Sequence, residues 1–195
     1  MTESFDFYFD FVSPYSFLAH KEIRRLEKRN LIMVNYKPIL LGGLHNLHGI
    51  KAPAFIPSKA KFMIRDCKMV AEKKKIKFKF NSYFPIKTIN LMRGVFIAKE
   101  DEFESYYIEN IFNSIWKDGL NMNDQNICDK VLKNTNINPK TFFLRASSES
   151  IKNILRKKTD EAFEKGIFGA PTFIVNNKIF WGQDRLEYAI AETKK

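Results

Sequence analysis

Apolar and polar residues alternate at the start of the chain and predict a β-strand that leads into a helix. Phenylalanine occupies every second position from Phe5 to Phe11, which is the period of two expected of a strand. Ser13-Pro14 then offers an N-cap serine and a proline at the first helical position. A helix is expected to about residue 30. Its dipole and unpaired first-turn amides favour an anion beside Ser13, although from this stretch alone a simple cap explains the serine.

Hydrophobic periodicity divides the rest of the chain into a strand, a long helical block and a hairpin. A second strand is expected at 31–37, parallel to the first, and the glycines and proline of 42–53 indicate a loop. Apolar residues then recur at helical spacing for about a hundred residues. The expected helices are 57–75, 88–99, 103–117, 124–132, 139–146 and 150–165. Strands at 172–175 and 178–181 flank an Asn-Asn turn typical of a hairpin, and a last helix is expected at 184–192.

The order β-α-β, helical block, β-β-α predicts an α/β, thioredoxin-like fold with an all-helical insertion. We assign 1–55 and 167–195 to the thioredoxin-like domain and 56–166 to the helical insertion. The 195 residues are enough to bury a substantial core, and 19 phenylalanines indicate that this core is aromatic-rich.

The net charge of +11 raises the question of an anionic partner. The charge is scattered over the expected helices, and 73–75 is its only sharp run. A nucleic-acid role lacks the clustered aromatic platform expected for it. No signal peptide or transmembrane run is visible. We therefore expect a cytoplasmic protein that binds neither nucleic acid nor membrane.

The cysteines and histidines suggest no metal or redox centre. Cys67 and Cys128 are far apart and lack flanking histidines, so we expect two free thiols and neither a zinc site nor a CxxC pair. His45 and His48 in one loop are weak grounds for a metal site. His20 lies one turn beyond Ser16, so it is either a base near Ser13 or, the simpler interpretation, a partly exposed structural residue.

A second informative stretch precedes the expected hairpin. Gly169-Ala170-Pro171 leads directly into a strand, and in a thioredoxin-like topology we expect a cis peptide bond before Pro171. Ala170 would then present its backbone N–H and C=O beside Ser13, where an extended peptide can pair with them.

Three motifs in order carry a family resemblance: 9–16, 168–172 and 181–186. Together they resemble the 2-hydroxychromene-2-carboxylate isomerases, bacterial relatives of the kappa-class glutathione transferases, over nearly the whole chain. The resemblance implies a DsbA-like thioredoxin fold, a homodimer and glutathione as cofactor. Residue by residue, Ser13 matches the catalytic serine that holds the glutathione sulfur as a thiolate. Ala170 and Pro171 match the cis-proline loop that pairs with glutathione, and Gln183 and Asp184 match the residues that cap its γ-glutamyl end.

The resemblance also implies residues around the rest of the site. Lys59 matches a lysine expected to bind the glycyl carboxylate of glutathione, and Lys51 is a further candidate ligand for a carboxylate. Tyr83, Phe84 and Trp181 are expected to form walls around an aromatic substrate. Asp10 matches a family residue near the site that is expected to orient the backbone there.

The chain also departs from the family pattern. Ile50 stands where the family often has asparagine, Gln183 where serine or asparagine is usual, and Lys87 where asparagine is usual.

Four functions remain open. The first is a glutathione-dependent isomerase, in which the thiolate adds to an unsaturated aromatic carboxylate and is later eliminated. The second is a kappa-like glutathione transferase acting on another electrophile. A DsbA-type oxidoreductase would need a CxxC at 13–16, where this chain has Ser-Pro-Tyr-Ser. A non-enzymatic binder of an anionic partner is the fourth.

Overall fold

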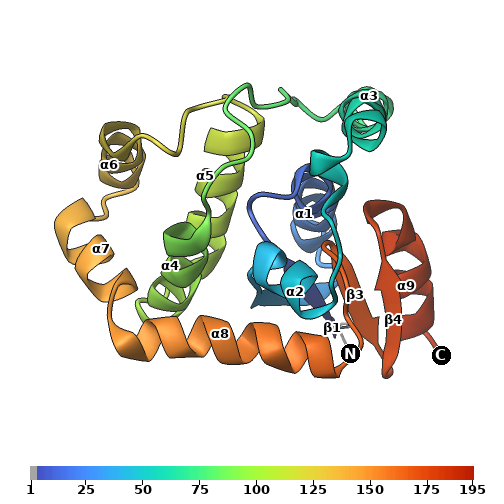
Figure 1. Cartoon of the computed structure of the whole chain (residues 1–195). Coiled ribbons are helices and arrows are strands. Elements are labelled where there is room, and N and C mark those ends of the chain that lie inside the picture. The colour runs from blue at the N-terminus through green and yellow to red at the C-terminus, as the bar shows by residue number, and fades with distance from the viewer. Residues whose placement is uncertain (1–3) are drawn as a thin grey trace.

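The computed structural model describes residues 4–195 as a four-stranded sheet surrounded by helices (Figure 1). The first three residues of the segment 1–55 lie outside the described residues. In chain order the elements, with η for a 3-10 helix, are β1 (Ser4–Phe9), α1 (Pro14–Glu27), β2 (Met33–Pro38), α2 (Leu41–Leu47), η1 (Pro53–Phe55), α3 (Pro57–Lys73), α4 (Ile89–Glu100), α5 (Glu104–Trp116), α6 (Gln125–Asn134), α7 (Pro139–Ala146), α8 (Glu149–Glu164), β3 (Thr172–Val175), β4 (Lys178–Trp181), η2 (Gln183–Arg185) and α9 (Leu186–Thr193).

The strands lie in the order β2-β1-β3-β4, so the expected parallel pair and the expected hairpin belong to one sheet. β1 and β2 run parallel, joined by α1, with Phe7 opposite Tyr36. β3 runs antiparallel to both β1 and β4. The hairpin turn at Asn176 and Asn177 has positive φ at both residues (48° and 61°), as a type I′ turn requires. The alternating pattern at the N-terminus therefore forms a central strand of the sheet.

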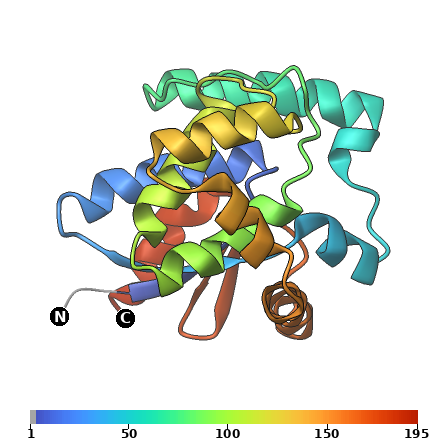
Figure 2. The same cartoon turned by 90° about the vertical axis from the view of Figure 1, so that its left-hand side faces the viewer.

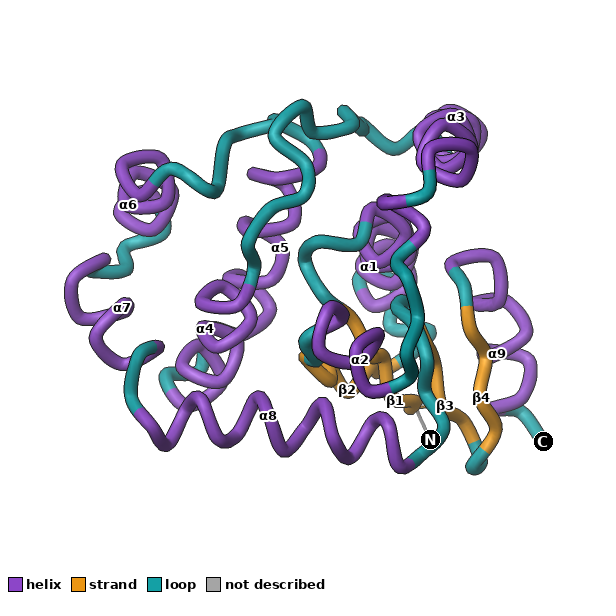
Figure 3. Tube along the Cα trace, in the orientation of Figure 1, coloured by secondary structure: helices purple, strands orange, loops and turns teal. Residues whose placement is uncertain are grey.

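Helices α4 to α7 form a group on one side of the strands, and α8 runs from that group back beneath the sheet (Figure 1). Seen from the side, α8 is viewed end-on and α3 lies along the opposite edge of the molecule (Figure 2). The strands occupy one half of the molecule (Figure 3). One cluster of buried residues joins Phe7 of β1 to Ile108 of α5 and Phe142 of α7. The assignment of 56–166 to a separate insertion domain stays a prediction.

The phenylalanines of β1 build an aromatic core between the sheet and α5. Phe7 stacks on Phe173 of β3 with ring centroids 5.6 Å apart. Phe11 meets Phe112 of α5 edge to face at 4.8 Å, a favoured geometry for aromatic pairs. The indole N–H of Trp116 donates to the Phe11 carbonyl oxygen at 2.7 Å. These contacts fix the segment that connects β1 to α1 against the helical group.

The prediction of a loop at 42–53 is wrong in part, because Leu41–Leu47 forms the helix α2. Two of its first amides find side-chain acceptors: Leu40 N–H donates to Thr159 Oγ1 at 3.0 Å and Leu41 N–H to Asp10 Oδ2 at 2.8 Å. Leu44 is fully buried beside α8. Tertiary contacts therefore outweigh the low helix propensity of Gly42 and Gly43.

Two helix boundaries also differ from the expectation. α1 ends at Glu27 rather than near residue 30, and Asn30 adopts a positive φ of 53°, which a continuing helix does not allow. The last helical segment opens as η2 before α9 begins at Leu186.

His20 is a buried structural residue, not the partly exposed one expected. Its Nε2 pairs with Glu109 Oε2 at 2.7 Å, and its ring stacks on Phe112 at 5.0 Å. Burial lowers the pKa of His20 more than Glu109 raises it. Burial alone would raise the pKa of Glu109, but hydrogen bonds from His20 and Lys21 outweigh it and hold that pKa well below its usual range. His20 thus faces α5 and not Ser13.

We expect the free energy of unfolding to fall as pH drops below about 6.5, the usual pKa of histidine. Because the pKa of His20 is lowered in the folded protein, the unfolded chain binds more protons below about pH 6.5. The full stability is therefore present only above that pH and is lost as the pH falls. Urea denaturation between about pH 7.5 and pH 5 should show a slope that His20→Gln reduces by up to about 1.4 kcal/mol per pH unit. Some slope should remain, because burial also lowers the pKa of His45. An unchanged slope in His20→Gln would contradict this account.

Candidate functional site

A cavity of about 890 Å³ opens at the N-terminus of α1. Its volume lies within the range of about 300–1,000 Å³ typical of small-molecule sites. Its walls come from the β1–α1 connection, α2, η1, the first turns of α3, the segment 84–89, the cis-proline loop and the end of β4. Segments far apart in the chain therefore converge on the end of one helix.

Ser13 caps α1 and faces the cis-proline loop. Its Oγ accepts a hydrogen bond from Ser16 N–H at 3.1 Å, as an N-cap side chain should. The same hydroxyl donates to the Ala170 carbonyl oxygen at 3.0 Å. The expected cap is confirmed, and the hydroxyl lies where the partial positive charge of the helix end is greatest.

The cis-proline loop has the geometry expected from the sequence. The Ala170–Pro171 peptide bond is cis, and a second cis bond at Phe84–Pro85 was not expected. Ala170 precedes β3 and lies outside the strand register, so its backbone edge borders the cavity with Ser13. Pro171 is buried behind this edge, and its carbonyl oxygen accepts from Gly182 N–H at 2.9 Å.

Asp10 joins three of the segments that form the cavity. This fully buried carboxylate accepts from Val12 N–H at 3.0 Å, Leu41 N–H at 2.8 Å and Thr88 Oγ1 at 2.6 Å. Burial raises the pKa of Asp10, and the three hydrogen bonds oppose that rise. The expectation that Asp10 orients backbone near the site agrees with these contacts, whereas the part played by Thr88 was missed.

Aromatic side chains form much of the cavity wall. Phe84 and Trp181 line it, and so do Phe55, Phe62 and Phe168, which were not predicted. A Cβ added to Gly169 would lie 2.5 Å from Trp181 Nε1, so a glycine is needed for the indole to lie here.

Tyr83 lies outside the lining of the cavity. The ring of Phe84 packs inward, 5.9 Å from that of Trp116. Tyr83 is consequently turned outward, and its side chain is exposed. We therefore leave Tyr83 out of the proposed substrate wall.

Lysines supply positive charge at the mouth of the cavity. Lys51, Lys59 and Lys87 line it, and none of them has an ion-pair partner within residues 4–195.

Gln183 and Asp184 do not line the cavity but form η2, which packs against α1 and follows the Gly182 contact to the cis-proline loop. Asp184 pairs with Arg185 at 3.1 Å.

The two thiols and the imidazoles of His20 and His48 have structural places, whereas His45 lines the cavity with Ser13. Cys67 and Cys128 are buried and free. Burial raises the pKa of the Cys67 thiol, and it raises that of Cys128 to about 11, so neither is an activated nucleophile. His48 Nε2 bonds the Ile167 carbonyl oxygen at 2.8 Å.

The described residues contain no cluster suited to a metal ion, and none of their helices is long and apolar enough to cross a bilayer.

A helix N-terminus beside a cis-proline loop, at the end of a mixed four-stranded sheet, agrees with a thioredoxin-like fold. A family model of DSBA-like thioredoxin domains matches residues 5–191, and the chain belongs to this family. The fold class expected from the sequence is therefore confirmed.

Curated relatives confirm the resemblance to isomerases and kappa-class transferases. The chain is 28% identical to a 2-hydroxychromene-2-carboxylate isomerase of Sphingobium xenophagum over 96% of both chains. It is 25% identical to glutathione S-transferase kappa 1 of Rattus norvegicus over 93% of this chain and 87% of that one. A solved structure of a 2-hydroxychromene-2-carboxylate isomerase has a TM-score of 0.88, at 23% identity and over 96% of this chain and 93% of that one.

Proposed function

We propose that this protein is a glutathione-dependent enzyme of the 2-hydroxychromene-2-carboxylate isomerase type. The observation that carries the proposal is the position of Ser13 Oγ, which lies at the N-terminus of α1, 3.0 Å from the Ala170 carbonyl oxygen and at the edge of an apolar cavity. The named isomerases among the relatives support it.

The residues at this end of the cavity fit glutathione. When bound, glutathione would supply a thiolate that adds reversibly to an unsaturated aromatic carboxylate. Ser13 would donate its hydroxyl hydrogen to the sulfur, and the first-turn amides of α1 would favour its charge. The backbone edge at Ala170 and Pro171 would pair with the tripeptide.

Charged and polar side chains would bind the two ends of glutathione. Lys59 would pair with the glycyl carboxylate. Gln183 and Asp184, which follow the contact between Gly182 and the cis-proline loop, would cap the γ-glutamyl end. Such contacts would orient the sulfur at Ser13, and holding two reactants in a productive geometry lowers the barrier of a bimolecular reaction.

The remaining volume of the cavity suits an aromatic carboxylate. Phe84 and Trp181 would flank the ring, and Lys51 would bind the carboxylate and stabilise negative charge that develops on the substrate. The same cavity could serve a kappa-like transferase acting on another small electrophile, an alternative that the 25% identity to kappa-class enzymes supports. The homodimer implied by the family and the cytoplasmic location expected from the sequence stay predictions.

Calorimetric titration of reduced glutathione into the wild-type protein tests the proposal. We expect saturable binding at millimolar glutathione or below, followed by glutathione-dependent conversion of a chromene carboxylate monitored by ultraviolet absorbance. Binding without that conversion, but with conjugation of another electrophile, would favour the transferase. Absence of binding at millimolar glutathione would overturn both.

Lys59→Ala is expected to raise the KM for glutathione about tenfold and to leave kcat nearly unchanged, because a salt bridge to a remote carboxylate acts equally in the ground and transition states. Steady-state kinetics with varied glutathione measures the effect. The matched control is Lys61→Ala, on the same helix but outside the cavity lining. Equal effects of the two substitutions would remove Lys59 from the site.

A further inference from the structure

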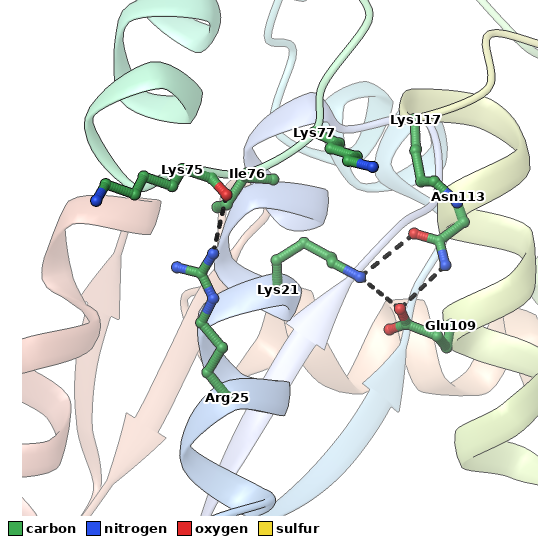
Figure 4. A pocket seen from close by; sticks show the side chains of 8 residues that line it. All are labelled: Lys21, Arg25, Lys75, Ile76, Lys77, Glu109, Asn113 and Lys117. Carbon is green, nitrogen blue, oxygen red and sulfur yellow. Dashed lines mark hydrogen bonds and ion pairs between the residues drawn. The ribbon is translucent and has the colours of Figure 1, made fainter.

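A second, smaller cavity of about 290 Å³ lies farther along α1 and shares no lining residue with the first (Figure 4). Its volume is close to the lower end of the range for small ligands. One carboxylate and five cationic side chains line it, namely Glu109, Lys21, Arg25, Lys75, Lys77 and Lys117. The proposed glutathione chemistry makes no use of this charge.

Among residues 4–195, Glu109 is the one carboxylate that lines this cavity, and it already has other partners. Glu109 pairs through Oε2 with His20 at 2.7 Å and through Oε1 with Lys21, and it accepts from Asn113 Nδ2 at 3.0 Å. These contacts hold Glu109 in one place beside α1. Its negative charge is therefore paired with Lys21, and Glu109 forms no ion pair with Lys77 or Lys117 within residues 4–195.

Lys77 and Lys117 remain available for an external anion. Lys77 has no ion pair within the part of the chain that the structure describes, and Lys117 has only a 3.7 Å pairing with Asp118. Both side chains lie on the same side of the cavity as the ammonium group of Lys21, whereas the ammonium group of Lys75 points away (Figure 4).

Main-chain contacts fix the frame that carries these lysines. Arg25 donates to the carbonyl oxygens of Lys74 at 2.7 Å and Lys75 at 3.1 Å. Lys79 N–H donates to the Trp116 carbonyl oxygen at 2.7 Å. The segment between α3 and this contact is thereby fastened to α1 at one end and to α5 at the other. Lys77 is thus presented from a backbone held at both ends.

We infer that this cavity binds the phosphate groups of a small diphosphate-bearing molecule. Lys77 and Lys117 face one small volume beside the ion pair of Lys21 with Glu109, and a diphosphate carries enough negative charge and enough acceptor oxygens to engage both lysines at once. A single carboxylate would leave most of the positive charge unpaired. The site is separate from the glutathione site and does not depend on the proposed reaction.

The test is calorimetric titration of pyrophosphate, and separately of ADP, into the wild-type protein at low ionic strength. We expect both to bind with similar affinity, and the double variant Lys77→Ala/Lys117→Ala to weaken binding by tenfold or more. The control is Lys140→Ala/Lys157→Ala, which removes two exposed lysines from α7 and α8 and lowers the net charge equally. That control should change affinity less than twofold.

Three results would overturn the inference. Equal weakening by both double variants would attribute binding to the general positive field of the protein. No pyrophosphate binding at millimolar concentration would remove the site altogether. Much tighter binding of ADP than of pyrophosphate, with no effect of Lys77→Ala/Lys117→Ala, would place the nucleotide elsewhere and would also contradict it.

Discussion

Ser13→Ala is expected to lower glutathione-dependent turnover by about 100- to 1,000-fold, the cost typical of losing one preorganised donor to a reacting anion. The hydroxyl lies at the N-terminus of α1, 3.0 Å from the Ala170 carbonyl oxygen, and alanine leaves the sulfur with the helix amides alone. Because the lost hydrogen bond acts on the reactive thiolate, kcat should fall more than KM rises. Steady-state kinetics with a chromene carboxylate measures both.

Two further variants separate chemistry from helix capping. Ser13→Gly also removes the hydroxyl, but glycine at an N-cap costs the helix only a few tenths of a kcal/mol, so its turnover should fall as far as that of Ser13→Ala. Ser16→Ala is the matched control, because the Ser16 hydroxyl is buried and has no hydrogen-bond partner among residues 4–195. Near-normal turnover in Ser13→Gly would show that Ser13 is a cap and nothing more.

Asp10→Ala is expected to lower the free energy of unfolding by about 3 kcal/mol, because it leaves buried donors without an acceptor. The carboxylate accepts from Val12, Leu41 and Thr88 in a fully buried position. For a chain of this length the melting temperature should fall by about 6–12 °C. Calorimetric unfolding measures the loss, and turnover below the melting temperature should also fall because the cavity segments are no longer joined.

Thr88→Val provides the graded comparison for Asp10. It removes one of the three donors and leaves the carboxylate with two backbone amides, so we expect a loss of about 1 kcal/mol. A loss in Asp10→Ala no larger than that in Thr88→Val would show that the backbone contacts of Asp10 contribute little.

Local signals in the sequence were enough to place the centre of the site. The Ser13-Pro14 pair predicted the start of α1 through capping and the backbone preference of proline, which act within a few residues. The cis bond at Pro171 was predicted from the position of Gly169-Ala170-Pro171 in a thioredoxin-like topology. The alternating phenylalanines likewise predicted a strand that leads into a helix, which is β1.

The walls of the cavity were harder to predict because they depend on packing between distant segments. α2 forms despite its glycines, since Asp10 and Thr159 accept its first amides. Tyr83 and Phe84 are adjacent, and only the contact of Phe84 with Trp116 decides which one faces inward. The only signal for Phe55 in the sequence is that it is an aromatic residue just before the Lys59 segment. The structure shows that it is exposed and lines the cavity.

The most direct test of the central claim is the pKa of the glutathione thiol bound to the protein, followed by ultraviolet absorbance of the thiolate across pH. The account predicts that the wild-type protein lowers this pKa well below that of free glutathione, and that Ser13→Ala returns most of the shift. An unshifted thiol in the wild-type complex, or a shift of equal size in Ser13→Ala, would contradict the claim that Ser13 and the end of α1 hold a thiolate.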